Sequence, residues 1–529
     1  MSDSDAGRLP LLLAAAVRLD PADDVAIART DLPQGSAWLL NSASEQDTRL
    51  VIRCLVPGGH KVALTHITAG APVHRYGHVI GFASQDIEPG DHVHTHNLAA
   101  LEFARNVPAG LRAQPAGPSG LGAGATFLGY RRPSGRVGTR NYVAVVSTVN
   151  CSAHTARQIA LHFGPERMSG YTHVDGVVAF THPYGCPMRH GNPDFVLLQR
   201  TLAGIVRHVN VGAALLVGLG CESNQISALM DDYKLGDRTD GAWQPPLRYL
   251  VIQEQGGIRK AVRAGIERVE ELLLAANDVQ RTPQPIGELM LAVQCGGSDS
   301  WSGVTANPLV GLVADAVVQQ GGTVVLAETP EIYGAEHLLA QRAVGPEVRA
   351  RLLDKVRWWE EHTRRLGLEI DNNPSPGNRT GGLTTIYEKS LGAIAKGGST
   401  PLVAVYDYAE PVTARGLTFM DSPGYDPVSV TGQMAGGCNL VLFTTGRGSV
   451  FGGKPAPAIK VCSNSRTFER MSDDMDFNAG VLAEGADMGA AAADLLNLVL
   501  SVASGRPSAS EAQGVGEAEF NPWNLGGYL

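Results

Sequence analysis

The stretch VDGVVAFTHPYGC, Val174 to Cys186, shows the pattern from which the fold can be predicted. An apolar, valine-rich run leads directly into a polar loop that ends on a cysteine. Continuous runs of this kind are typical of strands that are buried on both faces of a parallel sheet. The sequence therefore predicts a buried strand with a cysteine in the loop at its carboxyl end.

Similar apolar runs recur along the chain and alternate with helical segments. They are YVAVVSTV, GAALLVGL, ELMLAVQ, GGTVVLAE and CNLVLFTT. Strands that alternate with helices predict α/β domains with parallel sheets. The pair YVAVVSTVNC and VDGVVAFTHPYGC also resembles the pair LMLAVQCGG and GGTVVLAETPEIYGAE, which indicates an internal repeat. We therefore expect two similar doubly wound domains, at residues 130–285 and 286–507, followed by a C-terminal tail at 508–529.

The first hundred residues have a different character. Short alternating segments are separated by Pro-Gly and Ala-Gly turns, as in VAIARTDLPQG, VALTHITAGAPV and DIEPGDHV. This pattern predicts a small β-rich module at residues 1–105. A Gly-, Pro- and Ala-rich segment at 106–129 is typical of a linker. The expected fold class is thus α/β, with a β-rich N-terminal module before the two parallel-sheet domains.

Composition and charge limit the partners and the compartment. The chain has 43 basic and 52 acidic residues, a net charge of −9, and no long basic run. We therefore expect no nucleic acid and no membrane as partner. The N-terminus is acidic where a signal peptide is basic, and no segment approaches the ~20 apolar residues of a membrane span. Seven cysteines in so long a chain indicate free thiols, so we expect a cytoplasmic protein.

Three cysteines are evenly spaced. Cys151, Cys186 and Cys221 lie 35 residues apart, and each follows an apolar run. A strand and its crossover helix occupy about this length, so the three thiols are expected at one carboxyl edge, where open α/β sheets bind ligands. Thiolates are soft ligands, and the set is a candidate iron site, either with a single ion or with an iron–sulfur cluster. The alternative is that each cysteine is a small buried apolar residue.

Histidines of the N-terminal module are further candidate metal ligands. His60 lies in GGHK, and DHVHTHN contains His92, His94 and His96. If the strand persists, alternation places the last three on one face, and imidazole is a common ligand of iron, zinc and manganese. The alternative is a solvated face or a helix cap.

Proton transfer and anion binding have their own candidates. His182 and Tyr184 share the loop of Cys186, and Glu222 and Glu328 each follow a strand, so these four are candidate acids or bases. The glycine-punctuated loops TTGRGSVFGGK and NNPSPGNRTGG offer candidate ligands for an oxyanion, namely Thr445, Arg447, Lys454 and Arg379. Neither GxxxxGK[ST] nor GxGxxG follows a strand, which disfavours a phosphate or dinucleotide site.

A series of motifs, in order, resembles the altronate and galactarate dehydratase family of sugar-acid hydro-lyases. They are GYRRPSGRVGTRNY, HPYGC, VGLGCESNQ, CGGSDSWSGVTANPLVG, ETPEIYGAE, NPSPGNRTGG, TTGRG and DFNAG, and GHKVAL and GDHVHTHNL resemble the N-terminal SAF module of that family. The resemblance implies removal of water from a polyhydroxy carboxylate to give a 2-keto-3-deoxy acid. It also implies dependence on Fe²⁺, with Mn²⁺ or an iron–sulfur cluster as alternatives, and we expect a homo-oligomer.

Three other functions are compatible with parts of the sequence. A relative that cleaves sulfolactate has the same catalytic core, so another leaving group and another small 2-hydroxy acid are possible. The SAF-like module also suits a regulator that binds a sugar acid without turnover. Twin α/β domains suit a cofactor-dependent oxidoreductase, although the dinucleotide motif is absent.

Overall fold

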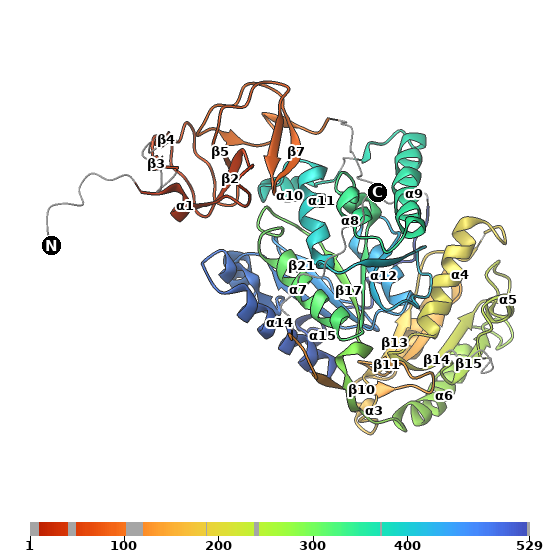
Figure 1. Ribbon diagram of the computed structural model, residues 1–529. Helices are drawn as coiled ribbons and strands as arrows, with labels where there is room; N and C mark the ends of the chain where they lie inside the picture. The colour runs from red at the N-terminus through yellow and green to blue at the C-terminus, as the bar shows by residue number, and fades with distance from the viewer. Residues whose placement is uncertain are drawn as a thin grey trace.

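Figure 1 shows the computed structural model of the chain, which describes residues 10–40, 49–101, 120–186, 188–236, 243–370 and 373–525. The described chain forms a β-rich N-terminal module and two parallel sheets covered by helices. These features confirm the predicted fold class. Most of the predicted linker lies outside the described residues. No described helix combines the length and the hydropathy that a membrane span requires.

The N-terminal module consists of short antiparallel strands. Its strands are β1 (Ala16–Val17), β2 (Val25–Ala28), β3 (Ala37–Leu39), β4 (Arg49–Val51), β5 (Lys61–Ala63), β6 (Pro72–Arg75), β7 (His78–Ala83), β8 (His92–Val93) and β9 (Leu98–Ala99). They pair in the orders β1-β2-β5-β8, β6-β7-β9 and β3-β4. The turns are tight: Gly90 has a φ of +90°, and a Cβ there would lie 2.0 Å from the Val51 carbonyl oxygen. Glycine is therefore required at this turn.

The first α/β domain contains a four-stranded parallel sheet in the order β13-β12-β14-β15. The strands are β12 (Tyr142–Ser147), β13 (Gly176–Phe180), β14 (Val211–Gly218) and β15 (Leu247–Val251), and the main helices are α2 (Asn150–Leu161), α4 (Pro193–Val206), α5 (Ile226–Asp232) and α6 (Ile258–Asn277). Val143 and Val145 pack with α2 and α6, whereas Ala144 and Val146 pack with α4 and α5. Both faces of the sheet are thus apolar, as the valine-rich runs predict.

The second α/β domain contains a seven-stranded parallel sheet in the order β19-β20-β18-β17-β21-β22-β23. The strands are β17 (Met290–Cys295), β18 (Thr323–Ala327), β19 (Leu402–Tyr406), β20 (Gly416–Met420), β21 (Leu440–Thr445), β22 (Ala458–Cys462) and β23 (Phe477–Asn478). The helices include α7 (Ala306–Gln319), α8 (Glu336–Gln341), α9 (Pro346–Arg365), α10 (Pro376–Thr380), α11 (Ile386–Ile394), α12 (Asp426–Ala435), α13 (Ser465–Arg470), α14 (Met488–Ala503) and α15 (Ala509–Ala512). Helices α7, α11 and α14 share one apolar cluster with the sheet, and α12 packs on the opposite face.

The two parallel sheets repeat one topology. The order β13-β12-β14-β15 corresponds to β18-β17-β21-β22, so the two matched pairs of apolar runs occupy equivalent positions. Helix α4 packs against α12, and one apolar cluster joins the two domains. A small antiparallel sheet of β10 (Thr126–Arg131), β11 (Val137–Gly138) and β16 (Thr282–Pro285) also lies at this junction. The segment after residue 507 packs on both domains, since Phe520 joins the shared cluster and Arg140 pairs with Glu511.

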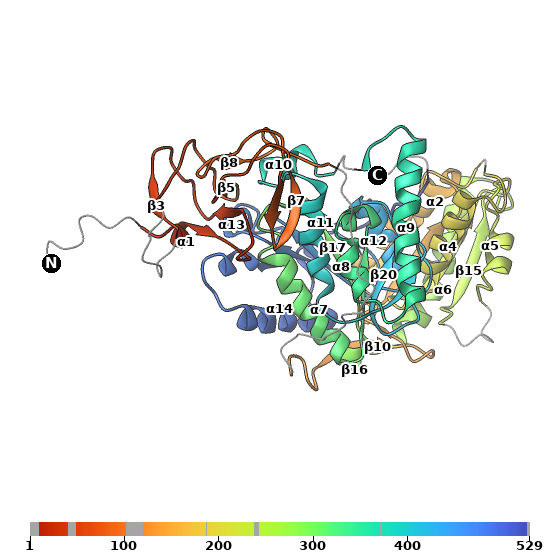
Figure 2. The ribbon, with the colours of Figure 1, turned by 45° about the horizontal axis from the view of Figure 1, so that its top comes forward.

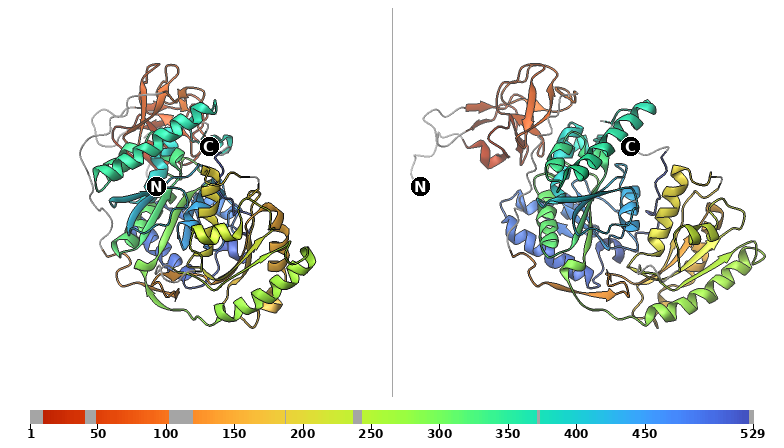
Figure 3. Two further views of the ribbon diagram at one scale, coloured as in Figure 1. Left: turned by 90° about the vertical axis from the view of Figure 1, so that its right-hand side faces the viewer. Right: turned by 45° about the vertical axis from the view of Figure 1, so that its right-hand side comes forward.

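A buried ionic contact fixes the N-terminal module to the second domain. Figures 2 and 3 show the module against α10 and α11, at the end of the molecule opposite to the first sheet. Lys61 Nζ donates to both carboxylate oxygens of Glu388, at 2.9 and 3.0 Å, and Arg75 also pairs with this carboxylate. All three side chains are buried. Burial would raise the pKa of Glu388, but the two cations and the hydrogen bonds outweigh it and lower the pKa to about 2.

The substitution Glu388→Gln should destabilise the docked module strongly. It keeps the size of the side chain but leaves two buried cations uncompensated, which costs about 3–5 kcal/mol. Glu361→Gln is the matched control, because it breaks an exposed pair with Arg365 on helix α9 that is worth less than about 1 kcal/mol. Urea unfolding of both variants measures the difference. Equal decreases in the free energy of unfolding of the two variants would show that the ionic contact does not hold the module.

Candidate active site

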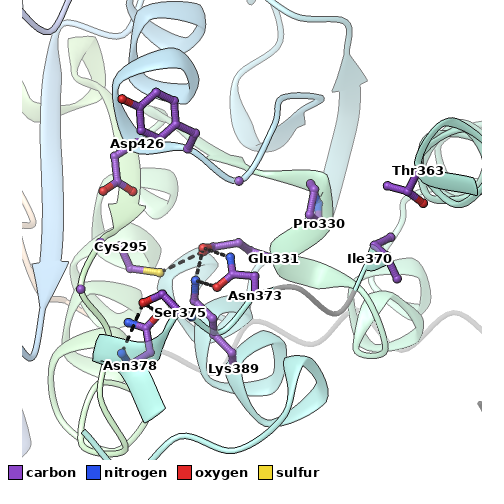
Figure 4. A pocket seen from close by; sticks show the side chains of 14 residues that line it. Cys295, Pro330, Glu331, Thr363, Ile370, Asn373, Ser375, Asn378, Lys389 and Asp426 are labelled. Atoms are coloured by element: carbon purple, nitrogen blue, oxygen red, sulfur yellow. Dashed lines mark hydrogen bonds and ion pairs between the residues drawn. The ribbon is translucent and has the colours of Figure 1, made fainter. Parts of the chain in front are cut away.

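A polar cavity of about 300 Å³ lies at the carboxyl edge of the second sheet. Loops after β17 and β18, the segment before α10, helix α11 and the start of α12 form its walls. Its polar side chains are those of Cys295, Glu331, Thr363, Asn373, Ser375, Asn378, Lys389, Tyr425 and Asp426. Figure 4 shows Asp426 on one side and the group of Cys295, Glu331, Asn373 and Lys389 on the other. Ligands of open α/β sheets bind at this edge.

Glu331 and Lys389 form the ionic centre of the cavity. Lys389 Nζ donates to Glu331 Oε1 and, at 2.8 Å, to Asn373 Oδ1, while the Cys295 thiol contacts Glu331 Oε2 at 3.2 Å. Burial would raise the pKa of Glu331, but the charges of Lys389 and Lys396 outweigh it and lower the pKa to about 2. Burial, followed by the charge of Glu331, raises the pKa of Cys295 to about 12. Without a metal, therefore, Glu331 is charged and Cys295 is a neutral thiol.

Glu328 is the residue whose environment fits a cation best. It is buried, and neither carboxylate oxygen has a hydrogen-bond partner. Its φ of +69° is unusual for a residue with a side chain, and such backbone strain is frequent at functional sites. Burial, followed by the charges of Glu331 and Asp426, raises the pKa of Glu328 well above its ordinary value. A divalent cation at this point would compensate the carboxylate that the protein leaves unpaired.

A group of three potential ligands surrounds that point. Among the described residues, one ligand atom from each of Cys295, Glu328 and Glu331 lies within 4.8 Å of the other two. Thiolate and carboxylate together suit a transition metal such as iron. The residues therefore fit the metal that the family resemblance implies.

Asp426 faces the same cavity from the first turn of α12. A Cβ at position 296 would lie 2.1 Å from Asp426 Oδ2, so glycine at 296 is what lets this carboxylate approach the end of β17. Burial and the charge of Glu331 raise the pKa of Asp426 to about 7. A carboxyl group with a pKa near neutral pH is suited to general acid–base catalysis.

The histidines of the N-terminal module cluster next to this site. Strand β8 ends at Val93, so the expected alternation through His96 is wrong, and a turn at 94–97 brings the rings together instead. The ring of His60 lies 5.0 Å from that of His92 and 5.1 Å from that of His94, and the rings of His92 and His96 are 5.4 Å apart. Burial, together with neighbouring histidines, lowers the pKa of His60 to about 4 and that of His92 to about 3. These two rings are neutral at pH 7.

Backbone contacts connect the histidine cluster to the wall of the cavity. His94 Nε2 lies 2.9 Å from the Arg379 carbonyl oxygen, and His60 Nε2 lies 3.2 Å from that of Thr380. Helix α10, which contains both residues, also contributes Asn378 to the cavity lining. The histidines thus lie behind the cavity wall. Their ring nitrogens are absent from the described groups in which three ligand atoms lie within 4.8 Å of one another.

The four predicted anion ligands occupy different places. Arg447 is exposed at the rim of the cavity, and its backbone N–H donates to the Gly297 carbonyl oxygen at 2.8 Å. Thr445 lies beside Gly297 but is buried and accepts from the Gly448 N–H. Arg379 lines a separate cavity of about 250 Å³ between the module and α11. Lys454 pairs with Glu517 at 3.0 Å. Neither Lys454 nor Arg447 lines the main cavity, but the Arg447 backbone contacts Gly297, which does.

Three of the four predicted acids and bases lie at the first sheet. His182 is buried, and its ring nitrogens contact the Ser147 carbonyl oxygen and the Tyr184 N–H, which leaves neither for a substrate. Glu222 accepts from Thr148 and from two backbone N–H groups. We therefore do not retain His182 or Glu222 as the base. Tyr184 is half-buried beside His182, away from the main cavity.

The cysteines and histidines of the predicted metal set are also separated. Cys151, Cys186 and Cys221 lie at the first sheet, whereas His60, His94 and His96 belong to the module at the opposite end of the molecule (Figure 3). The three cysteines and the three histidines are therefore not placed to bind one metal ion together. Glu328 alone among the four predicted acids and bases lies next to the main cavity, with a carboxylate oxygen within 4.8 Å of ligand atoms of the lining residues Cys295 and Glu331.

Three regions of the chain match sequence profiles of one enzyme family. Residues 14–101 match the altronate/galactarate dehydratase SAF domain, and residues 129–277 match the second domain of D-galactarate dehydratase/altronate hydrolase. Residues 286–527 match the C-terminal part of D-galactarate/altronate dehydratase. The chain belongs to the altronate and galactarate dehydratase family.

Individual relatives agree with this assignment. The chain is 36% identical to altronate dehydratase of Escherichia coli over 499 residues, which are 94% of the chain and 96% of the relative. It is 36% identical to the galactarate dehydratase (L-threo-forming) of the same organism over 485 residues, 88% and 90% of the two proteins. The beta subunit of (2R)-sulfolactate sulfo-lyase from Chromohalobacter salexigens is 36% identical over 403 residues, 75% of the chain and 97% of the subunit.

Glu328→Gln in this dehydratase should have opposite effects on metal binding and on stability. Loss of the charged ligand should lower the affinity for Fe²⁺ or Mn²⁺ at least about 10-fold. The metal-free variant should be about 1–3 kcal/mol more stable at pH 7, because an unpaired buried carboxylate is removed. Folding raises the pKa of Glu328, so the native chain loses stability as the pH rises above the ordinary pKa of a glutamate, and the variant does not. The stability gain of the variant should therefore vanish near pH 4.

Calorimetric metal titration and thermal unfolding with a chelator measure the two effects. The exposed Glu469→Gln on α13 is the control and should change neither. Unchanged metal affinity together with a lower stability of the Glu328→Gln variant would contradict the assignment.

Proposed function

We propose that the cavity at the carboxyl edge of the second sheet is the active site, where the chain removes water from an aldonate or aldarate such as altronate or galactarate. As a member of its family the chain is a hydro-lyase, and the product is a 2-keto-3-deoxy acid. The observation that carries the proposal is the position of the unpaired Glu328 carboxylate beside Cys295 and Glu331. These two residues line a cavity that also contains the cation Lys389 and the Asp426 carboxyl group, whose pKa is raised to about 7.

The reaction makes three demands on the site. A base must take the proton next to the substrate carboxylate, positive charge must stabilise the second negative charge that develops there, and the hydroxyl on the next carbon must leave. The resulting enol becomes a ketone without further help. A divalent metal ion, which we propose to be Fe²⁺ with Mn²⁺ as an alternative, supplies Lewis acidity. Glu328, Cys295 and Glu331 would hold it.

Residues of the chain can meet the other demands. Asp426 faces the cavity with a raised pKa and is our candidate base, in place of His182. Lys389, held by Glu331 and Asn373, provides fixed positive charge for the substrate carboxylate. Arg447 at the rim can add a two-pronged contact to a carboxylate. Glu331 and Lys389 are buried, and the low local dielectric constant strengthens their interactions.

The SAF module has a positioning role in this proposal. The buried contact of Lys61 with Glu388 and with the Gly382 carbonyl oxygen, at 2.6 Å, fixes the segment that follows α10. Helix α10, which directly precedes that segment, carries the wall residue Asn378 and contacts the histidine cluster. Metal binding by His60, His94 or His96, assembly into a homo-oligomer and cytoplasmic location stay predictions of the sequence.

The substrate class can be tested with a panel of acids. The full chain is incubated anaerobically with Fe²⁺ and with altronate, galactarate, other six-carbon aldonates and aldarates, or sulfolactate, and the 2-keto acid or released sulfite is measured. We expect a 2-keto acid from at least one sugar acid and none after chelation. Sulfite release from sulfolactate alone would favour the sulfolactate-type reaction, and binding of a sugar acid without turnover would favour a regulator.

Asp426→Asn should abolish the pH dependence along with most of the activity. The base form of Asp426 predominates above a pKa of about 7 in the metal-free chain, and a bound cation lowers this value. We therefore expect kcat/KM of the native enzyme to rise with pH through an ionisation at or below about pH 7. The variant should lose about 100-fold or more. Asp407→Asn, at the partly exposed pair with Lys355, is the control. If kcat/KM of the Asp426→Asn variant still rises with pH as it does in the native enzyme, another residue is the base.

Arg447→Met tests the contact at the rim. The substitution keeps bulk but removes a charged hydrogen bond worth about 1.5–3 kcal/mol, so kcat/KM should fall at least ~10-fold. Arg466→Met changes another exposed arginine on the neighbouring helix α13 and should have no effect. Equal kinetics of the two variants would show that Arg447 does not contact the substrate.

A further inference from the structure

The first sheet has a carboxyl edge of its own, and three loops meet there. Cys151 lies in the first turn of α2 after β12, Cys186 follows β13, and Cys221 follows β14. These strands are neighbours in the order β13-β12-β14, so the loops emerge side by side. None of the residues that we assign to dehydration lies at this edge.

Hydrogen bonds connect the three loops close to the cysteines. The Asn150 N–H donates to the Tyr184 carbonyl oxygen at 2.9 Å, and the Asn224 N–H donates to that of Gly185 at 3.2 Å. Asn224 Nδ2 also donates to the Thr148 carbonyl oxygen at 2.9 Å. Each bond involves residues within three positions of a cysteine. The backbone therefore brings the three cysteine-bearing segments together.

Gly185 is the point of closest approach. Its φ is +103°, and a Cβ there would lie 2.6 Å from the Thr148 carbonyl oxygen and 2.8 Å from the Val149 Cα. Only glycine tolerates both this conformation and this contact. The residue before Cys186 thus touches the backbone two residues before Cys151, which is the packing expected where loops surround a bound group.

The three thiols are exposed, unlike the buried Cys295, Cys438 and Cys462. Packing of small apolar residues therefore does not explain them. Cys151 lies at the N-terminus of the twelve-residue helix α2. Gln253 Nε2 donates to Cys221 Sγ at 3.4 Å, and hydrogen bonds to sulfur are one means by which proteins tune a bound cluster.

The spacing of the sulfur atoms does not suit a single ion bound by all three thiols. Ligand atoms of one ion lie within about twice a ~2.3 Å metal–sulfur bond of each other. These three cysteines, all among the described residues, do not form a group in which the ligand atoms lie within 4.8 Å of one another. A polynuclear iron–sulfur cluster binds each thiolate through a different iron and spans a wider set.

We propose that Cys151, Cys186 and Cys221 bind an iron–sulfur cluster at the carboxyl edge of the first sheet, separate from the mononuclear metal of the second domain. Three thiolates leave one iron of a four-iron cluster without a cysteine. Next to Cys221 lies a cavity of about 370 Å³, lined by Gly220, Glu222 and Gln225 among others, which gives a small ligand access to this region.

The cluster can be detected in the full-length chain without any assay of turnover. Protein purified anaerobically, or reconstituted with Fe²⁺ and sulfide, should show broad visible absorption and about four acid-labile sulfides per chain. Each of the variants Cys151→Ser, Cys186→Ser and Cys221→Ser should lose most of the sulfide. The control Cys54→Ser, at an exposed cysteine of the N-terminal module, should retain it. Retention in all three variants, or no labile sulfide in the native chain, would overturn the proposal.

A second measurement on the native sequence covers the case in which a variant does not fold. In the reconstituted protein, alkylation followed by mass spectrometry should modify Cys54 but spare the three cysteines, and chelation of the iron should expose them. Equal alkylation before and after chelation would overturn the proposal. The Glu328→Gln variant should keep the cluster while it loses the mononuclear metal, so failure of one proposal is distinguishable from failure of the other.

Discussion

Burial of charge at the carboxyl edge of the second sheet is the constraint on which the rest of the site depends. Glu328 and Glu331 are buried close to the half-buried Asp426, and the charges of Lys389 and Lys396 offset them. Lys389 pairs with Glu331, so Glu331 remains charged while Glu328 lacks any partner. A fold that isolates a carboxylate in this way is less stable than it need be. A cation bound at Glu328 would compensate the carboxylate charge, so the free energy that the fold loses by burying Glu328 would favour binding of the cation.

A second buried charge organises the boundary of the site. Glu388 on α11 is surrounded by Lys61 and Arg75 from the SAF module and by the Thr384 hydroxyl, so the module can dock in only one orientation. Lys389, the next residue of α11, faces the cavity. Adjacent residues on one helix thus hold the module and supply the cation that we propose for the substrate carboxylate. This arrangement explains how a small β-rich module can influence a reaction that occurs in another domain.

The domain types could be predicted from the sequence better than the site. Valine-rich runs identify buried strands because parallel sheets exclude water on both faces, and the matched pairs of runs indeed occupy equivalent positions in the two sheets. Glu328 was predictable because it directly follows such a run. Asp426 and Lys389 were not, since they begin or continue helices far along the chain, and only the fold brings them to Cys295. His182 was misjudged because its partners are backbone groups, which no side-chain pattern reveals.

The position of the metal tests the central claim most directly. Crystals of the full chain grown anaerobically with Fe²⁺ can be measured on both sides of the iron absorption edge, which locates iron independently of activity. We predict an anomalous peak about 2 Å from a Glu328 carboxylate oxygen, in contact with Cys295 or Glu331. Anomalous density at the histidine cluster of the SAF module, with none beside Glu328 under conditions that support turnover, would contradict the account.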